Sequence, residues 1–161
     1  MDGKILVARK DGVYLMKFVG DVRVTLCATV DSFLESMFLD KRFKSVVVDL
    51  TKTVGIDSTS LGILAKLSIQ ARQKFGYTPT LVSTNPDITR LLKSVGFEDV
   101  FHIVEQPIAN QEQLGELPGR DASEEDVRKR VLEAHRALVS LNESNREVFQ
   151  DLVKTLEAGC R

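Results

Sequence analysis

The chain of 161 residues is long enough to bury a hydrophobic core without metals or disulfides, and it suits one domain of ordinary size or a small domain with an appendage. Hydrophobic residues make up 43% and charged residues 28%, which is typical of a globular protein. The net charge of -1 gives no reason to expect binding to nucleic acid or to an anionic membrane.

The cysteines favour a reducing compartment, and the apolar runs favour neither secretion nor insertion into a membrane. Cys27 and Cys160 form no CxxC pair, and no Cys/His cluster has the spacing of a zinc site. The N-terminal segment lacks the long apolar stretch of a signal peptide, and no apolar run approaches the roughly 20 residues of a membrane helix. We therefore expect a cytoplasmic protein with no cofactor and no metal.

In chain order, strands alternate with helices over the first two-thirds of the sequence. Apolar, β-branched runs predict strands at 5–8, 13–19, 46–50, 79–84 and 100–104. Apolar spacing of three and four predicts helices at 30–38, 61–75 and 86–95. The order ββαβαβαβ predicts an α/β fold with a mixed sheet flanked by helices, and Asp11-Gly12 predicts a hairpin between the first two strands.

The remaining chain has a different character, which gives domain boundaries at 1–106, 107–122 and 123–158. The middle range, rich in proline and glycine, is expected to be a linker. An amphipathic helix should begin after Ser123, and its apolar spacing is close to a heptad seam with Asn145 at one seam position. A break near 142–145 is the alternative. The helix is expected to pack on its own domain, to self-associate, or to bind a helical partner.

The segment 46–64 carries the strongest functional signal, because a strand leads into a helix that begins with four capping-type residues. These residues are Asp57, Ser58, Thr59 and Ser60. One cap is worth about 1 kcal/mol and needs one such residue, so four exceed the structural need. Gly62 costs up to about 1 kcal/mol of helix propensity, which indicates close packing or the approach of a partner.

Catalytic uses of this segment find little support. A serine nucleophile at Ser58 would need a general base, and neither His102 nor His135 is near it in any evident way. The patterns GxSxG and GxGxxG and a phosphate-binding loop are absent. Asp49 and Asp57 could suggest a receiver domain, but the acidic pair that such a domain needs is missing. We therefore expect a binding module and not an enzyme.

The sequence VVVDLTKTVGIDSTSLG at 46–62 resembles the signature of the STAS family of sulfate-transporter and anti-sigma-antagonist domains. The order of the predicted elements agrees with this family, as do Asn85-Pro86 and Val95-Gly96-Phe97. The resemblance covers about two-thirds of the chain and implies a STAS-like sheet, to which the C-terminal helix would be an extension.

The resemblance implies a bacterial anti-sigma factor antagonist, or anti-anti-sigma factor, that regulates transcription by partner switching. Its partner would be an anti-sigma factor, often a serine kinase, bound when Ser58 is unphosphorylated. Phosphorylation of Ser58 would block binding, and a PP2C-type phosphatase would restore it. Thr59 is a less favoured acceptor. The implied partner-binding residues, listed together, are Arg23, Asp57, Ser58, Thr59, Ser60 and Gly62.

Two positions depart from the family pattern. Ser60 stands where the family usually has glycine, and Arg23 replaces an acidic residue often found at the partner surface. Two other functions stay open: a STAS scaffold subunit of a larger signalling or transport assembly, or an α/β domain that binds an anion or nucleotide at the Asp57 loop.

Overall fold

The computed structural model describes residues 2–107 and 114–159, and it opens with the expected hairpin. Strands β1 (Lys4–Lys10) and β2 (Val13–Val22) pair antiparallel through a two-residue turn. Asp11 and Gly12 both have positive φ, at 51° and 84°. This backbone geometry matches the right-handed twist of the flanking strands, which is why Asp-Gly is favoured in such turns.

The sheet is mixed, as expected. Within the described residues its seven strands include a main path in the order β6-β5-β3-β2-β1-β7. Strands β3 (Ser45–Asp49), β5 (Thr80–Val82) and β6 (His102–Val104) run parallel to one another, and β3 runs parallel to β2. The fold class predicted from the alternation of strands and helices is confirmed.

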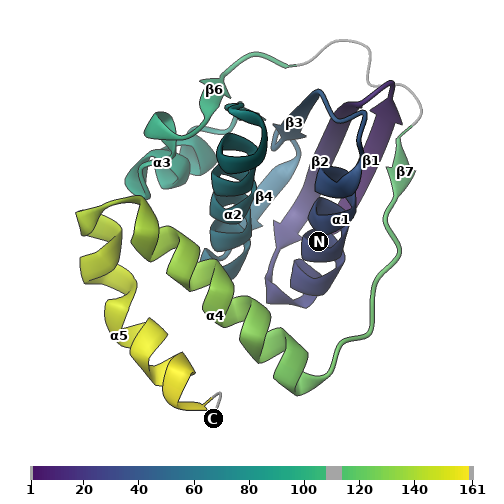
Figure 1. Cartoon of the computed structure of the whole chain (residues 1–161). Helices are drawn as coiled ribbons and strands as arrows, with labels where there is room; N and C mark the ends of the chain where they lie inside the picture. The colour runs from purple at the N-terminus through teal and green to yellow at the C-terminus, as the bar shows by residue number, and fades with distance from the viewer. Residues whose placement is uncertain (1, 108–113, 160–161) are drawn as a thin grey trace.

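Helices α1 (Cys27–Leu39) and α2 (Ser58–Phe75) lie over one face of the sheet, and α3 (Pro86–Ser94) lies beside α2 (Figure 1). Along β2, buried residues alternate with half-buried ones, as a strand with one face against the core requires. Buried side chains from the strands and from these three helices form one core, which Ala134, Ala137 and Leu138 of the C-terminal region join. Short 3-10 turns, η1 (Val24–Leu26) and η2 (Phe97–Asp99), precede α1 and β6.

Two short strands were not predicted. Strand β4 (Thr53–Ile56) pairs parallel with the end of β2 and leads directly into α2. Strand β7 (Gly115–Glu116) adds to the edge at β1. Part of the predicted linker 107–122 therefore pairs with the sheet, while its residues 108–113, like Cys160, lie outside the described residues.

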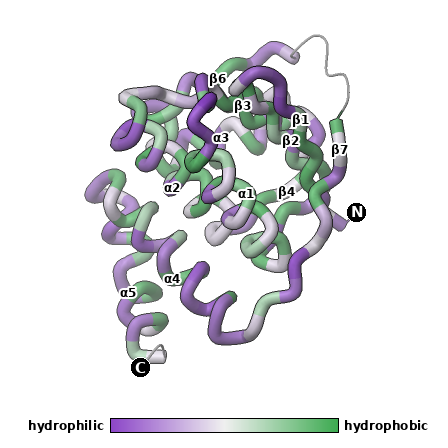
Figure 2. Tube along the Cα trace, turned by 45° about the vertical axis from the view of Figure 1, so that its right-hand side comes forward, coloured by the Kyte–Doolittle hydropathy of each residue, from purple (hydrophilic) through white to green (hydrophobic). Residues whose placement is uncertain are grey.

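The C-terminal region forms a hairpin of two helices, α4 (Glu124–Leu141) and α5 (Glu143–Gly159). The chain is extended at Asn142, so the expected single helix from 123 to 158 does not form and the alternative of a break describes the structure. Helix α4 crosses α2 on the side away from the sheet, and α5 lies against α4 as an outer layer (Figure 1). Polar and apolar residues alternate along both helices (Figure 2). No described helix is both long and apolar enough to cross a membrane.

Candidate functional site

Helix α2 begins at a side-chain cap that also holds the preceding loop. Asp57 is the N-cap residue, and its Oδ1 accepts a hydrogen bond of 2.8 Å from the backbone N–H of Ser60. Its Oδ2 accepts one of 2.7 Å from the backbone N–H of Val24. The carboxylate therefore satisfies one of the unpaired N–H groups of the helix and fixes the turn after β2 against the start of α2.

Ser58, the first residue of α2, contacts the C-terminal hairpin. Its Oγ lies 2.8 Å from Nε2 of His135 on α4. Nδ1 of His135 lies 2.8 Å from the carbonyl oxygen of Val131, which can only accept, so Nδ1 donates. In the neutral imidazole this leaves Nε2 to accept from the Ser58 hydroxyl. Both nitrogens of a side chain only 2% exposed are thus used within the protein.

The expectation that neither histidine lies near Ser58 is wrong for His135. Seventy-seven positions separate the two residues, so only the folding of α4 onto α2 brings them together. His102 begins β6 at the far edge of the sheet path and is exposed.

Gly62 explains why α4 can come so close. A Cβ built at Gly62 would lie 2.7 Å from the Cβ of Ala134 and would overlap the Ala134 carbonyl. The glycine inside the first turns of α2 therefore serves a close approach, as its cost in helix propensity suggested. The approaching element is this chain's own α4.

The remaining predicted site residues on α2 face inward. Thr59 and Ser60 are both buried, and the Ser60 hydroxyl lies 3.4 Å from the carbonyl oxygen of Val22. Ser60, in place of the family's usual glycine, thus points to the end of β2. A partner that approaches from solvent would not touch either side chain in this conformation.

Arg23 lies on a different side of the site, in an open groove of about 310 Å³ between β4 and α3. Its Nε donates to Asp21 at 2.6 Å, and this carboxylate raises the pKa of the Arg23 guanidinium. Asp57, Val54 and Leu91 also line the groove, and Val54 is exposed. Asp57 and Arg23 therefore face solvent, whereas Ser58 and Gly62 face α4.

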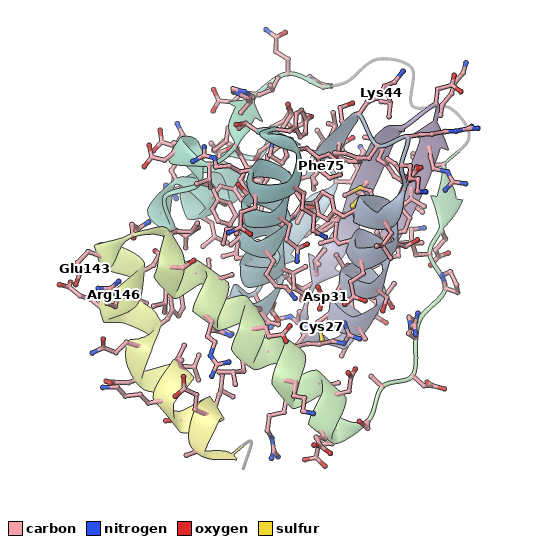
Figure 3. All side chains as sticks on the ribbon, in the orientation of Figure 1. Cys27, Asp31, Lys44, Phe75, Glu143 and Arg146 are labelled. Atoms are coloured by element: carbon pink, nitrogen blue, oxygen red, sulfur yellow. The ribbon has the colours of Figure 1, made fainter. Side chains whose placement is uncertain are left out.

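A partly buried ion-pair network that sequence reasoning did not identify joins three helices beside this site. Asp31 on α1 accepts from Lys66 Nζ on α2 at 3.0 and 3.1 Å and from Arg130 on α4 at 2.9 Å. Figure 3 shows Asp31 on the side of α1 that α4 passes. Lys66 also donates to Glu133 at 3.1 Å. Burial opposes the charge on Lys66, but the carboxylates outweigh it and raise its pKa.

Asn145, expected at a seam between helices, binds the protein's own backbone. Its Nδ2 donates to the carbonyl oxygens of Val95 at 2.9 Å and of Leu138 at 3.0 Å. Its backbone N–H donates to the side chain of Asn142 at 2.8 Å. The buried amide therefore attaches the start of α5 to α4 and to the end of α3.

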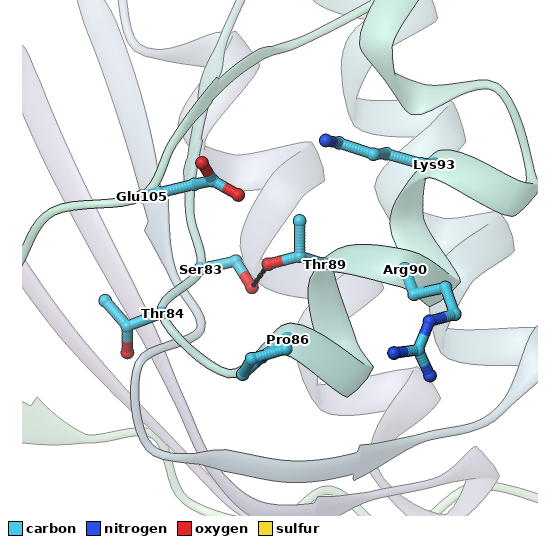
Figure 4. Close-up of a pocket in the computed structure, with 7 residues that line it drawn as sticks. All are labelled: Ser83, Thr84, Pro86, Thr89, Arg90, Lys93 and Glu105. Atoms are coloured by element: carbon cyan, nitrogen blue, oxygen red, sulfur yellow. Dashed lines mark hydrogen bonds between the residues drawn. The ribbon is translucent and has the colours of Figure 1, made fainter.

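A second groove, of about 410 Å³, lies at the start of α3. Arg90 and Lys93 line it, and two such cations could attract an anion. Its buried hydroxyls belong to Ser83 and Thr89, and they form a hydrogen bond of 2.8 Å with each other (Figure 4). Each of these two hydroxyls therefore already has a hydrogen-bond partner within the protein. Within residues 2–107 and 114–159, no group of acidic, histidine and cysteine side chains has the arrangement of a metal site.

Comparisons with known proteins agree with this architecture. A family model described as the STAS domain matches residues 4–113. A proposed anti-sigma factor antagonist from Thermotoga maritima is 20% identical with a TM-score of 0.55, over 62% of this chain and 85% of that one. A comparison with curated protein sequences finds no match.

Two further solved structures share the fold. The anti-sigma factor antagonist SpoIIAA in its unphosphorylated form is 8% identical, with a TM-score of 0.54 over 65% of this chain and 89% of that one. An anti-sigma factor antagonist from Mycobacterium paratuberculosis is 20% identical, with a TM-score of 0.57 over 65% and 87%. The shared part corresponds in extent to the sheet and its helices, without the length of the hairpin.

Proposed function

This chain belongs to the STAS domain family, and we propose that it is an anti-sigma factor antagonist whose switch is phosphorylation of Ser58. The observation that carries the proposal is the position of Ser58 as the first residue of α2, directly after the Asp57 cap. The solved structures with the same fold that are titled anti-sigma factor antagonists support it. The partner would be an anti-sigma factor or serine kinase, and a PP2C-type phosphatase would reverse the modification, in the cytoplasm.

The physical basis of the switch is local electrostatics. A phosphate adds roughly 1.5 to 2 negative charges at neutral pH. The start of α2 tolerates that charge, because unpaired N–H groups and the helix dipole favour anions there. A partner surface that fits a neutral hydroxyl must instead desolvate the charge or meet it without a counter-charge. The domain can therefore stay folded while binding is lost. Ser58 is a better acceptor than Thr59, which is buried.

The proposal describes a binding module without catalysis. Ser58 and His135 resemble a nucleophile and base in their 2.8 Å contact. However, the imidazole is almost fully buried, and its Nδ1 is held by the backbone carbonyl of Val131 and not by a carboxylate that would stabilise an imidazolium. A substrate would have to displace α4 to reach the pair. The alternative of an anion- or nucleotide-binding domain is tested by a thermal shift with nucleotides, which we expect to be absent.

The test is the affinity of the full chain for an anti-sigma factor or serine kinase from the same genome, measured by isothermal titration calorimetry. Ser58→Ala should bind like the wild type. Ser58→Asp should bind about tenfold more weakly or worse, a loss of about 1.4 kcal/mol of binding free energy. Ser94→Asp is the matched control, because Ser94 is exposed at the end of α3. Equal affinities of Ser58→Ala and Ser58→Asp would refute the switch.

A further inference from the structure

The side of α2 that carries Ser58 is a continuous stripe, and α4 covers it. Ser58, Gly62 and Lys66 are spaced four residues apart, so they share one face of the helix. Each contacts or closely approaches α4: Ser58 meets His135, Gly62 meets Ala134, and Lys66 meets Glu133. The acceptor, the close-approach glycine and the buried lysine are therefore all occupied by one element from the same chain.

A phosphate on Ser58 and the docked α4 compete for the same space. Phosphorylation joins Oγ to the γ-phosphorus of ATP, ADP leaves, and the hydroxyl proton passes to a base of the kinase. That proton is the one that Ser58 donates to His135 in the docked state. With the Ser58 side chain directed as it is here, the phosphoryl oxygens would overlap the imidazole, which the Val131 carbonyl and the ring of Phe149 hold in place.

We propose that the hairpin of α4 and α5 is an intramolecular cover of this stripe, and that a phosphate on Ser58 and the docked hairpin exclude each other. The kinase and the anti-sigma factor then reach the stripe only after the hairpin leaves α2. The inference rests on the proposed function for the identity of these partners. The exclusion itself rests on the contacts of Ser58 and Gly62 with α4.

The way the hairpin is attached suits a cover that detaches. The residues of α4 that are buried include small or polar ones, such as Ala134, His135 and Ala137. Leu138 packs into the core of the domain together with Ala134 and Ala137, and Arg130 adds an ion pair to Asp31 at 2.9 Å. In α5, Asn145 and Val153 are buried. Of the buried core cluster, the hairpin supplies Ala134, Ala137 and Leu138, so the sheet and its three helices retain the rest of the core when the hairpin separates.

The two processes are linked thermodynamically. If docking of the hairpin disfavours the phosphate, the phosphate disfavours docking by the same free energy. A partner can bind the stripe only in molecules whose hairpin is open. Its apparent affinity is therefore the intrinsic affinity multiplied by the fraction of open molecules. Docking of the hairpin thus lowers the apparent affinity of the chain for both the kinase and the anti-sigma factor.

The exclusion is tested on the full chain with phosphoserine placed at position 58 by nonsense suppression, so that no kinase is needed. Hydrogen exchange of α4 and α5 should become about tenfold faster or more than in the wild type, with the strands unchanged. Phosphoserine at position 36, on the exposed side of α1, is the matched control and should change neither. Unchanged or slower exchange in α4 would overturn the proposal, as would faster exchange throughout the sheet.

A second variant opens the hairpin without touching α2. Ala134→Leu places a larger side chain against Gly62 and should force α4 away, whereas Ala158→Leu on the exposed side of α5 makes the same change without a clash. Ala134→Leu should speed exchange in α4 and raise the affinity for the same anti-sigma factor or kinase several-fold; Ala158→Leu should do neither. An open hairpin without a gain in affinity would refute the cover. Equal binding of Ser58→Ala and Ser58→Asp would instead refute the proposed function and leave the exclusion standing.

Discussion

Asp57 and Ser58 are adjacent residues with different tasks. Asp57 holds the start of α2 through two backbone N–H groups, and its carboxylate also lines the open groove near Arg23. Ser58 makes its side-chain contact with His135. The sequence has four capping-type residues where one cap needs a single residue. The structure divides them into a cap, a residue under α4 and two buried hydroxyls.

At the same scale, Asp40 carries a pH-dependent contribution to stability. Its carboxylate accepts from the hydroxyl of Tyr14 and from the backbone N–H of Arg42, and these bonds lower its pKa. A lowered pKa of an acid in the folded state stabilises the fold at pH values above the ordinary pKa of about 4. This contribution is lost as the pH falls through the lower pKa of the folded state.

We therefore expect Tyr14→Phe to lower the free energy of unfolding at pH 7 and to have a smaller effect as the pH falls to about 3, since the carboxylate then begins to protonate. Urea unfolding across this range measures the difference. Tyr77→Phe is the control, because the Tyr77 hydroxyl binds the backbone of Val46 and no titrating group. A Tyr14→Phe penalty that does not change with pH would contradict the assignment.

At the scale of elements, the close crossing of α2 and α4 depends on one glycine. In an exposed helix, replacing glycine with alanine is favourable by up to about 1 kcal/mol. At Gly62 the new Cβ would collide with the backbone and side chain of Ala134, and neither can move without moving α4. At position 62, alanine should therefore destabilise the fold instead of stabilising it.

Gly62→Ala should lower the free energy of unfolding by about 1–3 kcal/mol, the usual cost of overpacking a close contact. Urea unfolding followed by circular dichroism measures it. Gly119→Ala is the matched control, since a Cβ at Gly119 meets nothing within 4 Å. A Gly62→Ala chain as stable as the wild type would show that α4 does not pack on α2 as described.

The elements that sequence reasoning missed are those whose strand character comes from tertiary pairing. Thr53–Ile56 is short and contains a glycine, and it becomes β4 because the end of β2 offers it hydrogen bonds. The heptad spacing across 123–158 fits a continuous helix, but Asn142 and Asn145 bond to each other and to Val95, which stabilises the break. Both outcomes depend on partners far away in the sequence.

At the scale of the whole molecule, the hairpin is a third layer on the sheet and its helices (Figure 1). The seam that suggested self-association is partly used within the chain, because Ala134, Leu138 and Asn145 are buried. Val148 and Leu152 remain exposed on α5. Two such side chains are far short of the roughly 800 Å² per partner that a stable interface buries.

The full chain is therefore expected to sediment as a monomer over a wide range of concentrations. Sedimentation velocity on a dilution series measures this, and Leu152→Glu should leave the sedimentation coefficient unchanged. A dimer that dissociates on dilution, and that Leu152→Glu abolishes, would instead support self-association through α5.

The sequence by itself determined the α/β class, the hairpin at Asp11-Gly12, the family and the position of Ser58 at a helix start. These depend on local propensities, periodicity and a contiguous motif, which neighbouring residues specify. Only the tertiary structure decided that His135 meets Ser58, that Ala134 is what approaches Gly62, and that Asp31 joins Lys66 to Arg130. Those contacts join residues tens of positions apart, and the packing of whole helices, which no local pattern encodes, brings them together.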